Sequence, residues 1–405
     1  MKKLLGVVIL GLSLLTLFCG KEAEKTDENV ARSTDTQVVS EASRDLKGQR
    51  IRVVFLNPAD DVKDGEFWWY VCSNFMKAAA ADLNIDLKIY NAKRSVPDLN
   101  KQAIAAMTGP DKPDFIVMQN LKKSAVSIIK EADKFNVKIL MFNSGLSEEE
   151  TAENGKPREK YKNWIGEILP DDAGAGYDLA DIIVKEAKSK KLVNNDGKVE
   201  MIALGGVVSD TSAIERNKGL MKYIQENKEN VILHRDQALP GNWEEKKANE
   251  VFSLAFSTFN NTTTVWNAND NMAIGVLKST KEKGGKKPGT DIIIGGIDWN
   301  PENLEGVKSG EISATIGGHF MEGAWTMVMI YDYANGVDFA DSEGVSMKSR
   351  MGVITSKNVA NFEKNLGDRS FEKIDKVDFK KFSKAMNPGM KKYSFDLDNI
   401  LKQFK

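Results

Sequence analysis

The chain has 405 residues, with 57 Lys and Arg against 58 Asp and Glu, so its formal net charge is −1. This balance provides no general attraction to nucleic acid, and we expect no nucleic-acid partner. Only two histidines and two cysteines are present, which is too few for a typical zinc site or a disulfide framework. We therefore expect no metal and no cofactor, and the length predicts two or three domains.

Residues 1–18 have the pattern of a secretory signal peptide, because a lysine pair precedes an apolar run too short to cross a membrane. The segment that ends at Cys19 resembles a bacterial lipoprotein signal, although Phe18 stands where a small residue is usual. We expect lipidation at Cys19 and a membrane-anchored protein in the periplasm or cell envelope; an uncleaved anchor and simple secretion are the alternatives. Residues 19–48 are polar and aperiodic, which predicts a flexible, lipid-anchored tether.

From residue 51 onward, short apolar runs alternate with segments of helical periodicity. The runs predict strands at residues 51–56, 87–90, 115–118, 138–142, 199–204, 231–233, 263–266, 292–297 and 312–316. The periodic segments predict helices at residues 67–79, 98–107, 124–135, 173–187, 212–226, 243–256, 272–283, 301–308 and 320–335. Strands that alternate with helices predict parallel sheets covered on both faces. Because these strands are many for one sheet, we expect an α/β fold of two doubly wound parallel-sheet lobes joined by a hinge.

The lobe boundary is expected where Pro170 and several glycines interrupt the apolar pattern, at residues 166–176. We expect an N-terminal lobe from residues 49–167 plus 319–340 and a C-terminal lobe from residues 168–318. After residue 335 the periodicity weakens, which predicts a C-terminal extension at residues 341–405 packed on the body.

In such folds the ligand contacts come from the loops at the strand ends. These loops hold aromatic rings, amides, one arginine and one aspartate, a set of groups suited to binding polyols. Part of the aromatic run at residues 67–70 is expected in the core, and Thr211 or Ser212 is expected to cap a helix. The candidate ligand-binding residues are Phe67, Trp68, Asn143, Arg216, Trp243, Asn269, Asp298 and His319.

Four stretches of the chain resemble a known family over residues 50–340. Residues 206–220, 269–275, 296–298 and 313–316 are similar to the periplasmic ribose/galactose-type binding proteins. These are the type I solute-binding proteins of ABC importers, and they are related to the effector domain of LacI-type repressors. The Asn-Asp-x-Met-Ala-x-Gly pattern at residues 269–275 is the most specific part. The first strand and its aromatic loop also resemble the autoinducer-2 receptor of vibrios.

The resemblance implies roles for the candidate residues. The stacking aromatics of the family match Phe67, Trp68 and Trp243, and its hydroxyl-binding groups match Asn143, Arg216, Asn269 and Asp298. Asn143 stands where the family often has Asp-Arg, and His319 lies near the place of a glutamine in the ribose binder. Both differences fall at the ligand and argue against ribose itself.

We therefore expect a monomeric solute-binding lipoprotein that captures a sugar or sugar-like ligand by hinge closure and delivers it to an ABC permease. The alternative is a ligand-sensing receptor that presents its bound state to a membrane sensor kinase or cyclase, which the sequence of the body does not distinguish. An enzyme is not expected, because a glycosidase needs two carboxylates across the scissile bond and only Asp298 is a convincing candidate. A repressor is disfavoured because a signal stands where a helix-turn-helix would lie.

Overall fold

The computed structural model describes residues 45–60, 62, 67–283 and 285–404. The expected signal peptide, the lipidation site Cys19 and all of the expected tether except residues 45–48 lie outside the described residues. Within the described part, no helix combines the length and the apolar character that crossing a membrane requires.

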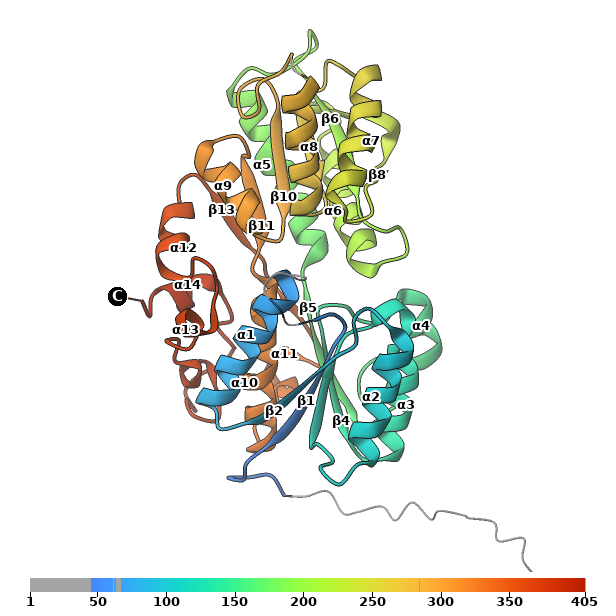
Figure 1. Ribbon diagram of the computed structural model, residues 1–405, viewed down its shortest axis with the longest axis vertical. Helices are drawn as coiled ribbons and strands as arrows, with labels where there is room; N and C mark the ends of the chain where they lie inside the picture. Colours follow the sequence, from blue (N-terminus) through green and yellow to red (C-terminus); the bar gives the residue numbers. More distant parts are fainter. Residues whose placement is uncertain (1–44, 61, 63–66, 284, 405) are drawn as a thin grey trace, which may run out of the picture. The chain divides into compact units, whose positions relative to one another are not determined.

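The first lobe is built on a parallel sheet with strand order β12-β5-β4-β3-β1-β2 (Figure 1). Its strands are β1 (Arg52–Asn57), β2 (Asp86–Asn91), β3 (Phe115–Met118), β4 (Lys138–Phe142), β5 (Trp164–Pro170) and β12 (Ser346–Ser349). Its helices are α1 (Phe67–Asp82), α2 (Val96–Thr108), α3 (Ala125–Lys134), α4 (Glu148–Asn154), α10 (Glu322–Ala334) and α11 (Ala340–Glu343), with 3-10 turns η1 (Leu121–Lys123) and η3 (His319–Met321).

The second lobe is built on a sheet with strand order β13-β11-β10-β9-β6-β7, and β8 also pairs with β6. Its strands are β6 (Val199–Gly205), β7 (Val231–Leu233), β8 (Leu239–Pro240), β9 (Thr264–Asn267), β10 (Ile293–Ile297), β11 (Ala314–Gly317) and β13 (Gly352–Thr355). Its helices are α5 (Asp172–Ser189), α6 (Thr211–Glu226), α7 (Glu245–Thr258), α8 (Asp270–Lys283) and α9 (Pro301–Ser309), with the 3-10 turn η2 (His234–Asp236). Only β13 runs antiparallel to its neighbour among these described pairings.

Alternate residues of each strand enter cores on opposite faces of the sheet. In β1, Val53 and Phe55 lie in the core that contains residues of α1 and α10, whereas Val54 and Leu56 lie in the core that contains residues of α2 and α3. Figure 1 shows these two pairs of helices on opposite faces of the sheet. A parallel sheet is buried on both faces, so its strands are apolar throughout, and this is why residues 51–56 form a continuous apolar run. The expected α/β fold with two parallel-sheet lobes is confirmed.

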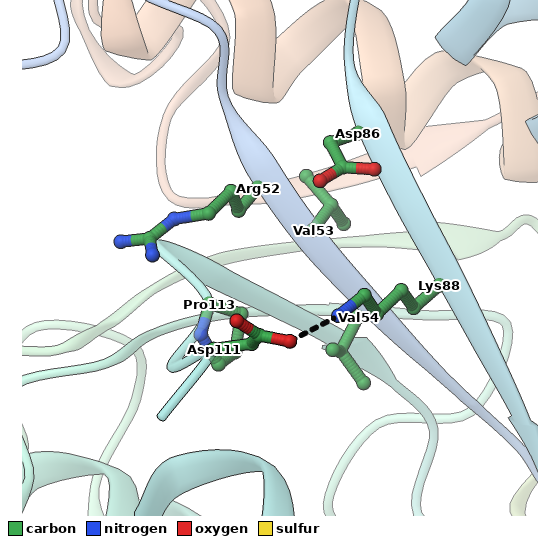
Figure 2. A pocket seen from close by; sticks show the side chains of 7 residues that line it. All are labelled: Arg52, Val53, Val54, Asp86, Lys88, Asp111 and Pro113. Atoms are coloured by element: carbon green, nitrogen blue, oxygen red, sulfur yellow. Dashed lines mark hydrogen bonds and ion pairs between the residues drawn. The ribbon is translucent and has the colours of Figure 1, made fainter. Parts of the chain in front are cut away.

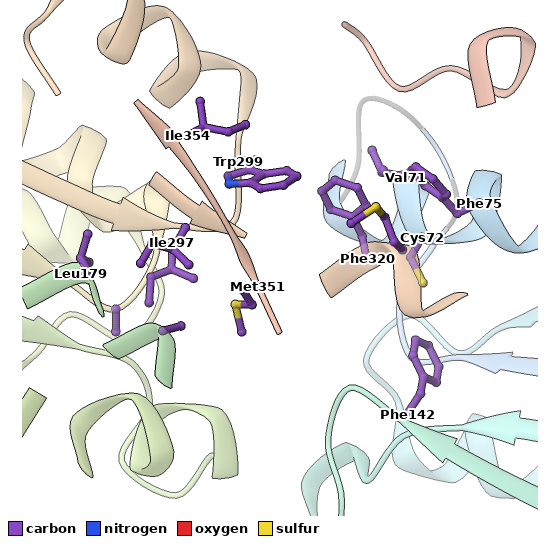
Figure 3. Close-up of a cluster of buried hydrophobic side chains, with 14 of the residues drawn as sticks. Val71, Cys72, Phe75, Phe142, Leu179, Ile297, Trp299, Phe320, Met351 and Ile354 are labelled. Atoms are coloured by element: carbon purple, nitrogen blue, oxygen red, sulfur yellow. The ribbon is translucent and has the colours of Figure 1, made fainter. Parts of the chain in front are cut away.

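The larger core continues from one lobe into the other near the crossover between them. The indole of Trp299, which comes after β10, lies 5.9 Å from the ring of Phe320 in η3, centroid to centroid (Figure 3). Phe320 in turn lies 5.5 Å from the ring of Phe75 in α1. Cys72 is buried in the same core and has no disulfide partner among the described residues.

The chain passes from the first lobe to the second inside the boundary expected at residues 166–176, but this region also contains part of a strand that was not predicted. Residues 164–170 form β5 of the first sheet, and α5 of the second lobe begins at residue 172. Gly166 is required by packing, since a Cβ there would lie 2.6 Å from the ring of Phe339 and 2.9 Å from the carbonyl oxygen of Val345. Pro170 ends the strand, where its missing N–H is tolerated. Glycine and proline are typical of linkers, and for this reason the sequence did not indicate that these residues form a buried strand.

Residues 341–405, expected as a C-terminal extension packed on the body, also contribute a strand to each sheet. Residues 346–349 add a parallel strand to the first sheet, and residues 352–355 add an antiparallel strand to the second. The chain beyond β13 packs on the outside of both lobes as α12 (Val359–Asn365), α13 (Phe371–Ile374), η4 (Phe379–Phe382) and α14 (Leu397–Leu401).

Candidate functional site

Three predicted residues, Arg216, Asp298 and His319, lie together at the carboxyl ends of strands in the second lobe. Arg216 Nη1 is 3.5 Å from Asp298 Oδ1, and His319 Nε2 is 3.6 Å from the same oxygen. Arg216 also donates from Nε to Asp172 Oδ1 at 2.7 Å and from Nη1 to the carbonyl oxygen of Ala268 at 2.6 Å. We call Arg216, Asp172, Asp298 and His319 the Arg216 cluster, and all four side chains are largely buried.

Two glycines let the helices that carry this cluster approach with their backbones in contact. A Cβ on Gly176 in α5 would lie 2.1 Å from the carbonyl oxygen of Arg216 in α6. A Cβ on Gly219 in α6 would lie 2.0 Å from the carbonyl oxygen of Ala173 in α5. Any side chain at either glycine would push the helices apart, and Asp172 at the start of α5 would then lose its ion pair with Arg216.

Asp172 is a member of the Arg216 cluster that was not among the predicted residues. It comes two residues after the end of β5, and its carboxyl group is buried. Asn143 and Asp298 were selected because they come directly after strands, and the same rule would have selected Asp172 if residues 164–170 had been recognised as a strand. Asp172 was therefore not predicted because strand β5 was not predicted.

Asp298 is presented by a tight turn in an unusual backbone conformation. The φ angles of Asp298 and Trp299 are 131° and 61°, in a region that non-glycine residues rarely adopt and that costs about 1–3 kcal/mol per residue. The backbone N–H of Asp298 donates to the carbonyl oxygen of Ile316 at 2.7 Å. The N–H of Trp299 donates to Thr315 Oγ1 at 3.3 Å, and its fully buried indole donates to the carbonyl oxygen of Thr315 at 3.2 Å. These contacts hold what we call the Asp298–Trp299 turn.

Burial sets the protonation of the cluster. It raises the pKa of Asp298 to about 6, although the Arg216 guanidinium opposes the shift. Burial, and then the positive charge of Arg216, hold the pKa of His319 well below its ordinary value. Burial also raises the pKa of Asp172 against the opposing effect of Arg216. At neutral pH the site therefore contains a guanidinium, an ionised Asp298 and a neutral imidazole.

Two tryptophans flank the cluster from different lobes. The ring of Trp68 in α1 lies 5.0 Å from the ring of His319, and the ring of Trp243 lies 5.6 Å from Cζ of Arg216. Trp68 Nε1 and His319 Nδ1 are buried without a hydrogen-bond partner in the part of the chain that the structure describes. Because unpaired buried polar atoms are costly, these two atoms are candidates for bonding to a ligand or water.

Asn269 acts on the protein itself. Its Oδ1 accepts the backbone N–H of Met272 at 3.0 Å, and its Nδ2 donates to the carbonyl oxygen of Trp243 at 3.3 Å. Trp243 is further fixed by its indole N–H, which donates to Asp210 Oδ2 at 2.8 Å. The amide predicted to bind a hydroxyl group therefore caps the start of α8 and holds Trp243 in place.

Asn143 is bonded within the first lobe. Its Nδ2 donates to Gln119 Oε1 at 2.8 Å, and its backbone N–H donates to Glu322 Oε2 at 3.1 Å. Glu322 is a second residue that was not predicted; it is buried and also accepts a hydrogen bond from Ser349. Burial raises the pKa of Glu322 well above its ordinary value. Its place in the first turn of a helix gave no sequence signal.

Phe67 lies in a different environment from the Arg216 cluster. Its ring centroid is 4.7 Å from Cζ of Arg369, a residue of the C-terminal segment. Both side chains line a hollow of about 540 Å³ together with residues of α9 and α12. Of the three aromatic residues predicted to stack on a sugar, Trp68 and Trp243 lie at the Arg216 cluster, whereas Phe67 lies beside Arg369.

A smaller hollow of about 150 Å³ lies at the opposite, amino-terminal edge of the first sheet (Figure 2). It is lined by the first residues of β1 and β2 and contains an ion pair between Lys88 Nζ and Asp111 Oδ2 at 3.0 Å. The predicted site residues lie elsewhere. Among the described residues, no three His, Cys, Asp or Glu side chains are grouped so that they could hold a metal ion.

Comparisons with known proteins agree with this architecture. The sequence model of the periplasmic binding protein domain matches residues 55–338. The galactofuranose-binding protein of Escherichia coli (strain K12) is 25% identical over 252 residues, which cover 62% of this chain and 72% of that protein. The name of this relative describes a binding protein, in agreement with the expected class.

Solved structures give the same result. A periplasmic sugar-binding protein from Pseudomonas fluorescens has a TM-score of 0.74 and 30% sequence identity, and the match covers 86% of this chain and 99% of that one. The binding protein of the arabinose ABC transporter from Shewanella sp. ANA-3, bound to L-arabinofuranose, has a TM-score of 0.61 at 21% identity, over 77% of this chain and 95% of that one. The chain therefore belongs to the family of periplasmic binding proteins.

Proposed function

We propose that this chain captures a sugar or sugar-like polyol between its two lobes and delivers it to an ABC-type importer. The observation that carries the proposal is the Arg216 cluster with its flanking rings. The carboxylate of Asp298 can accept hydrogen bonds from sugar hydroxyls, and Arg216 can donate to them. Trp68 and Trp243 offer apolar faces to the C–H groups of a sugar ring.

The known relatives support a sugar in the furanose form as the first ligand to test. The Escherichia coli relative is named for galactofuranose, and the Shewanella structure contains arabinofuranose. Residues of both lobes contribute to the proposed site, since Trp68 belongs to the first lobe and Arg216 to the second. A ligand held by both would favour the closed arrangement of the lobes through its higher affinity for it.

The remaining parts of the proposal concern location and partners. The pattern of residues 1–18 supports export, and Cys19 supports a lipid anchor with residues 19–48 as the tether. The protein would then work as a monomer in the periplasm or cell envelope beside an ABC permease. Loss of sugar uptake in a strain that lacks the protein would support the importer. Unchanged uptake with loss of a transcriptional response to the sugar would instead indicate a sensory receptor.

Calorimetric titration and thermal unfolding with D-galactose, L-arabinose, D-allose and myo-inositol test the binding directly. A ligand at about 100 times its Kd adds about 2.7 kcal/mol to the free energy of unfolding, which gives a measurable rise in Tm. The substitution Asp298→Asn should weaken binding strongly. Asp86→Asn, at the opposite edge of the first sheet, is the matched control and should bind as the wild type does. Full binding by Asp298→Asn would refute the proposed site.

A further inference from the structure

The segment after β13 contacts both lobes. α12 packs on α9 of the second lobe, whereas α13 and η4 pack on α1 of the first lobe. Figure 1 shows this segment, in red, along one side of the protein next to these helices. Arg369 lies between α12 and α13, at the point where the segment passes from one lobe to the other.

Arg369 is a buried cation without a paired anion. Only 1% of the residue is exposed, and none of the ion pairs among the described residues includes it. Its Nη1 donates a hydrogen bond to the carbonyl oxygen of Trp299. Its Cζ lies 4.7 Å from the ring centroid of Phe67 and 5.6 Å from those of Phe320 and Phe362. The guanidinium is therefore held by three aromatic faces and one carbonyl group.

The backbone around Arg369 is shaped to direct this side chain inward. Its φ angle is 53°, and its N–H donates to the carbonyl oxygen of Leu366 at 2.6 Å. Its carbonyl oxygen accepts a hydrogen bond from Asn74 Nδ2 in α1 at 3.3 Å. A left-handed conformation at a non-glycine residue and a desolvated charge both cost stability, and such costs are concentrated at functional positions.

The contacts of Arg369 lead to the proposed ligand site. The carbonyl oxygen that accepts its hydrogen bond belongs to the Asp298–Trp299 turn, and Phe320 and Phe67 adjoin His319 and Trp68 in the chain. We propose that Arg369 is a positioning residue, through which the C-terminal segment holds the Asp298–Trp299 turn and so sets the affinity for the sugar. This inference rests on the proposed function and assigns that site a determinant in the C-terminal segment.

The physical reason is that the turn is strained and depends on contacts that hold it. Arg369 also lines the hollow of about 540 Å³ with residues of α9, the helix that follows the turn. Without the donor from Arg369, the carbonyl group of Trp299 loses this hydrogen bond and the strained turn can relax. The carboxylate of Asp298 would then move relative to Arg216, with which it is in contact only at 3.5 Å.

The test compares Arg369→Met with Arg369→Lys in the full chain. Methionine fills the aromatic cage without a donor, whereas lysine keeps the charge and can reach a carbonyl group. Lys364→Met, an exposed residue of α12, is the matched control. With D-galactose, L-arabinose, D-allose and myo-inositol as probes, Arg369→Met should bind about 10- to 150-fold more weakly, the size expected for a lost hydrogen bond to a charged group. Arg369→Lys should recover most of the affinity.

A double substitution separates positioning from general stability. If Arg369 acts through Asp298, Arg369→Met should change Kd less than about twofold in an Asp298→Asn background, because contacts that act as a unit are not additive. The proposal would be overturned if Arg369→Met raised Kd by the same factor in the Asp298→Asn background as in the wild type. An unchanged Kd in the single variant Arg369→Met would also overturn it. Should Arg369→Met not fold, Arg369→Leu, which also lacks a donor, carries the same comparison with the same expected outcomes.

Hydrogen exchange tests the inference even if none of the probes binds. In the ligand-free protein, Arg369→Met should speed amide exchange at Asp298 and Trp299 at least tenfold, while the amides of β9 keep their wild-type rates. Unchanged exchange at the turn, or equal acceleration throughout the second sheet, would refute a positioning role. If the proposed function is wrong, none of the probes binds, but Arg369→Met still speeds amide exchange at the turn. If this inference is wrong, Arg369→Met does not speed exchange specifically at the turn.

Discussion

The pH dependence of sugar binding should report the ionisation of Asp298. Burial raises the pKa of this carboxyl group to about 6, so it loses its charge within an accessible range of pH. An ionised carboxylate accepts hydrogen bonds from hydroxyl groups about twice as strongly as a neutral acid does. We therefore expect sugar affinity to be highest above pH 7 and to fall as Asp298 is protonated.

The size of the effect can be worked out from the pKa. If only the ionised form binds, the apparent Kd is multiplied by one plus the ratio of protonated to ionised Asp298. With a pKa of about 6, this factor is close to 1 at pH 7.5 and about 11 at pH 5. Among the neighbours of this carboxyl group, Arg216 stays charged, and His319 stays neutral because its pKa lies well below its ordinary value. Burial raises the pKa of Asp270 to about 8, so this group stays largely protonated over the range, and burial also raises the pKa of Asp172, whose titration must be distinguished from that of Asp298.

Calorimetric titration with L-arabinose or D-galactose between pH 5 and pH 7.5 measures the profile. The wild type should lose about tenfold in affinity over this range, with a midpoint near pH 6. Asp298→Asn should bind weakly and show a nearly flat profile, because its amide does not titrate. A slope that persists in Asp298→Asn would place the titrating group elsewhere, with Asp172 the next candidate, and would refute the reasoning.

Three further outcomes are expected from the contacts. Arg216→Met should lower the free energy of unfolding by about 3–5 kcal/mol in chemical denaturation, since it leaves Asp172 and Asp298 buried without their cation; a loss below 1 kcal/mol would contradict the burial of the cluster. Trp299→Ala should cost about 3–5 kcal/mol, because the indole is fully buried. The ion pair at 2.8 Å between Lys218 in α6 and Glu148 in α4 is exposed, so Glu148→Gln should leave the midpoint of chemical denaturation nearly unchanged. Any difference should vanish in 1 M salt.

The sequence predicted the strands correctly where both faces of the sheet are buried. Strands such as β1 and β10 lie inside parallel sheets, so their apolar runs identify them without ambiguity. β5 was missed because Gly166 serves a close packing contact that only the folded chain reveals. β12 and β13 were missed because each is paired on one side only, at the edge of its sheet, and β12 has no continuous apolar run.

The site was predictable as far as the strand-end rule extends. Arg216 and Asp298 meet because parallel strands bring their carboxyl ends to one edge of the sheet. The rule does not reveal which polar groups also bond within the protein: Asn269, predicted to bind the ligand, caps helix α8 as well. The contact between Phe67 and Arg369 joins residues far apart in the chain, and no local pattern marks it.

The raised pKa of Asp298, which suits this residue for binding, also reduces the stability of the ligand-free protein at neutral pH. A carboxyl group with an ordinary pKa of 3.8 in the unfolded chain and about 6 in the folded protein binds more protons when folded between these values. Its contribution to stability is therefore greatest below pH 4 and declines by about 3 kcal/mol as the pH rises through 6. At neutral pH the fold keeps an ionised, largely buried carboxylate in a strained turn, and both features reduce its stability. Contacts that do not depend on the ligand must maintain this arrangement, and the hydrogen bond from Arg369 to Trp299 is one of them.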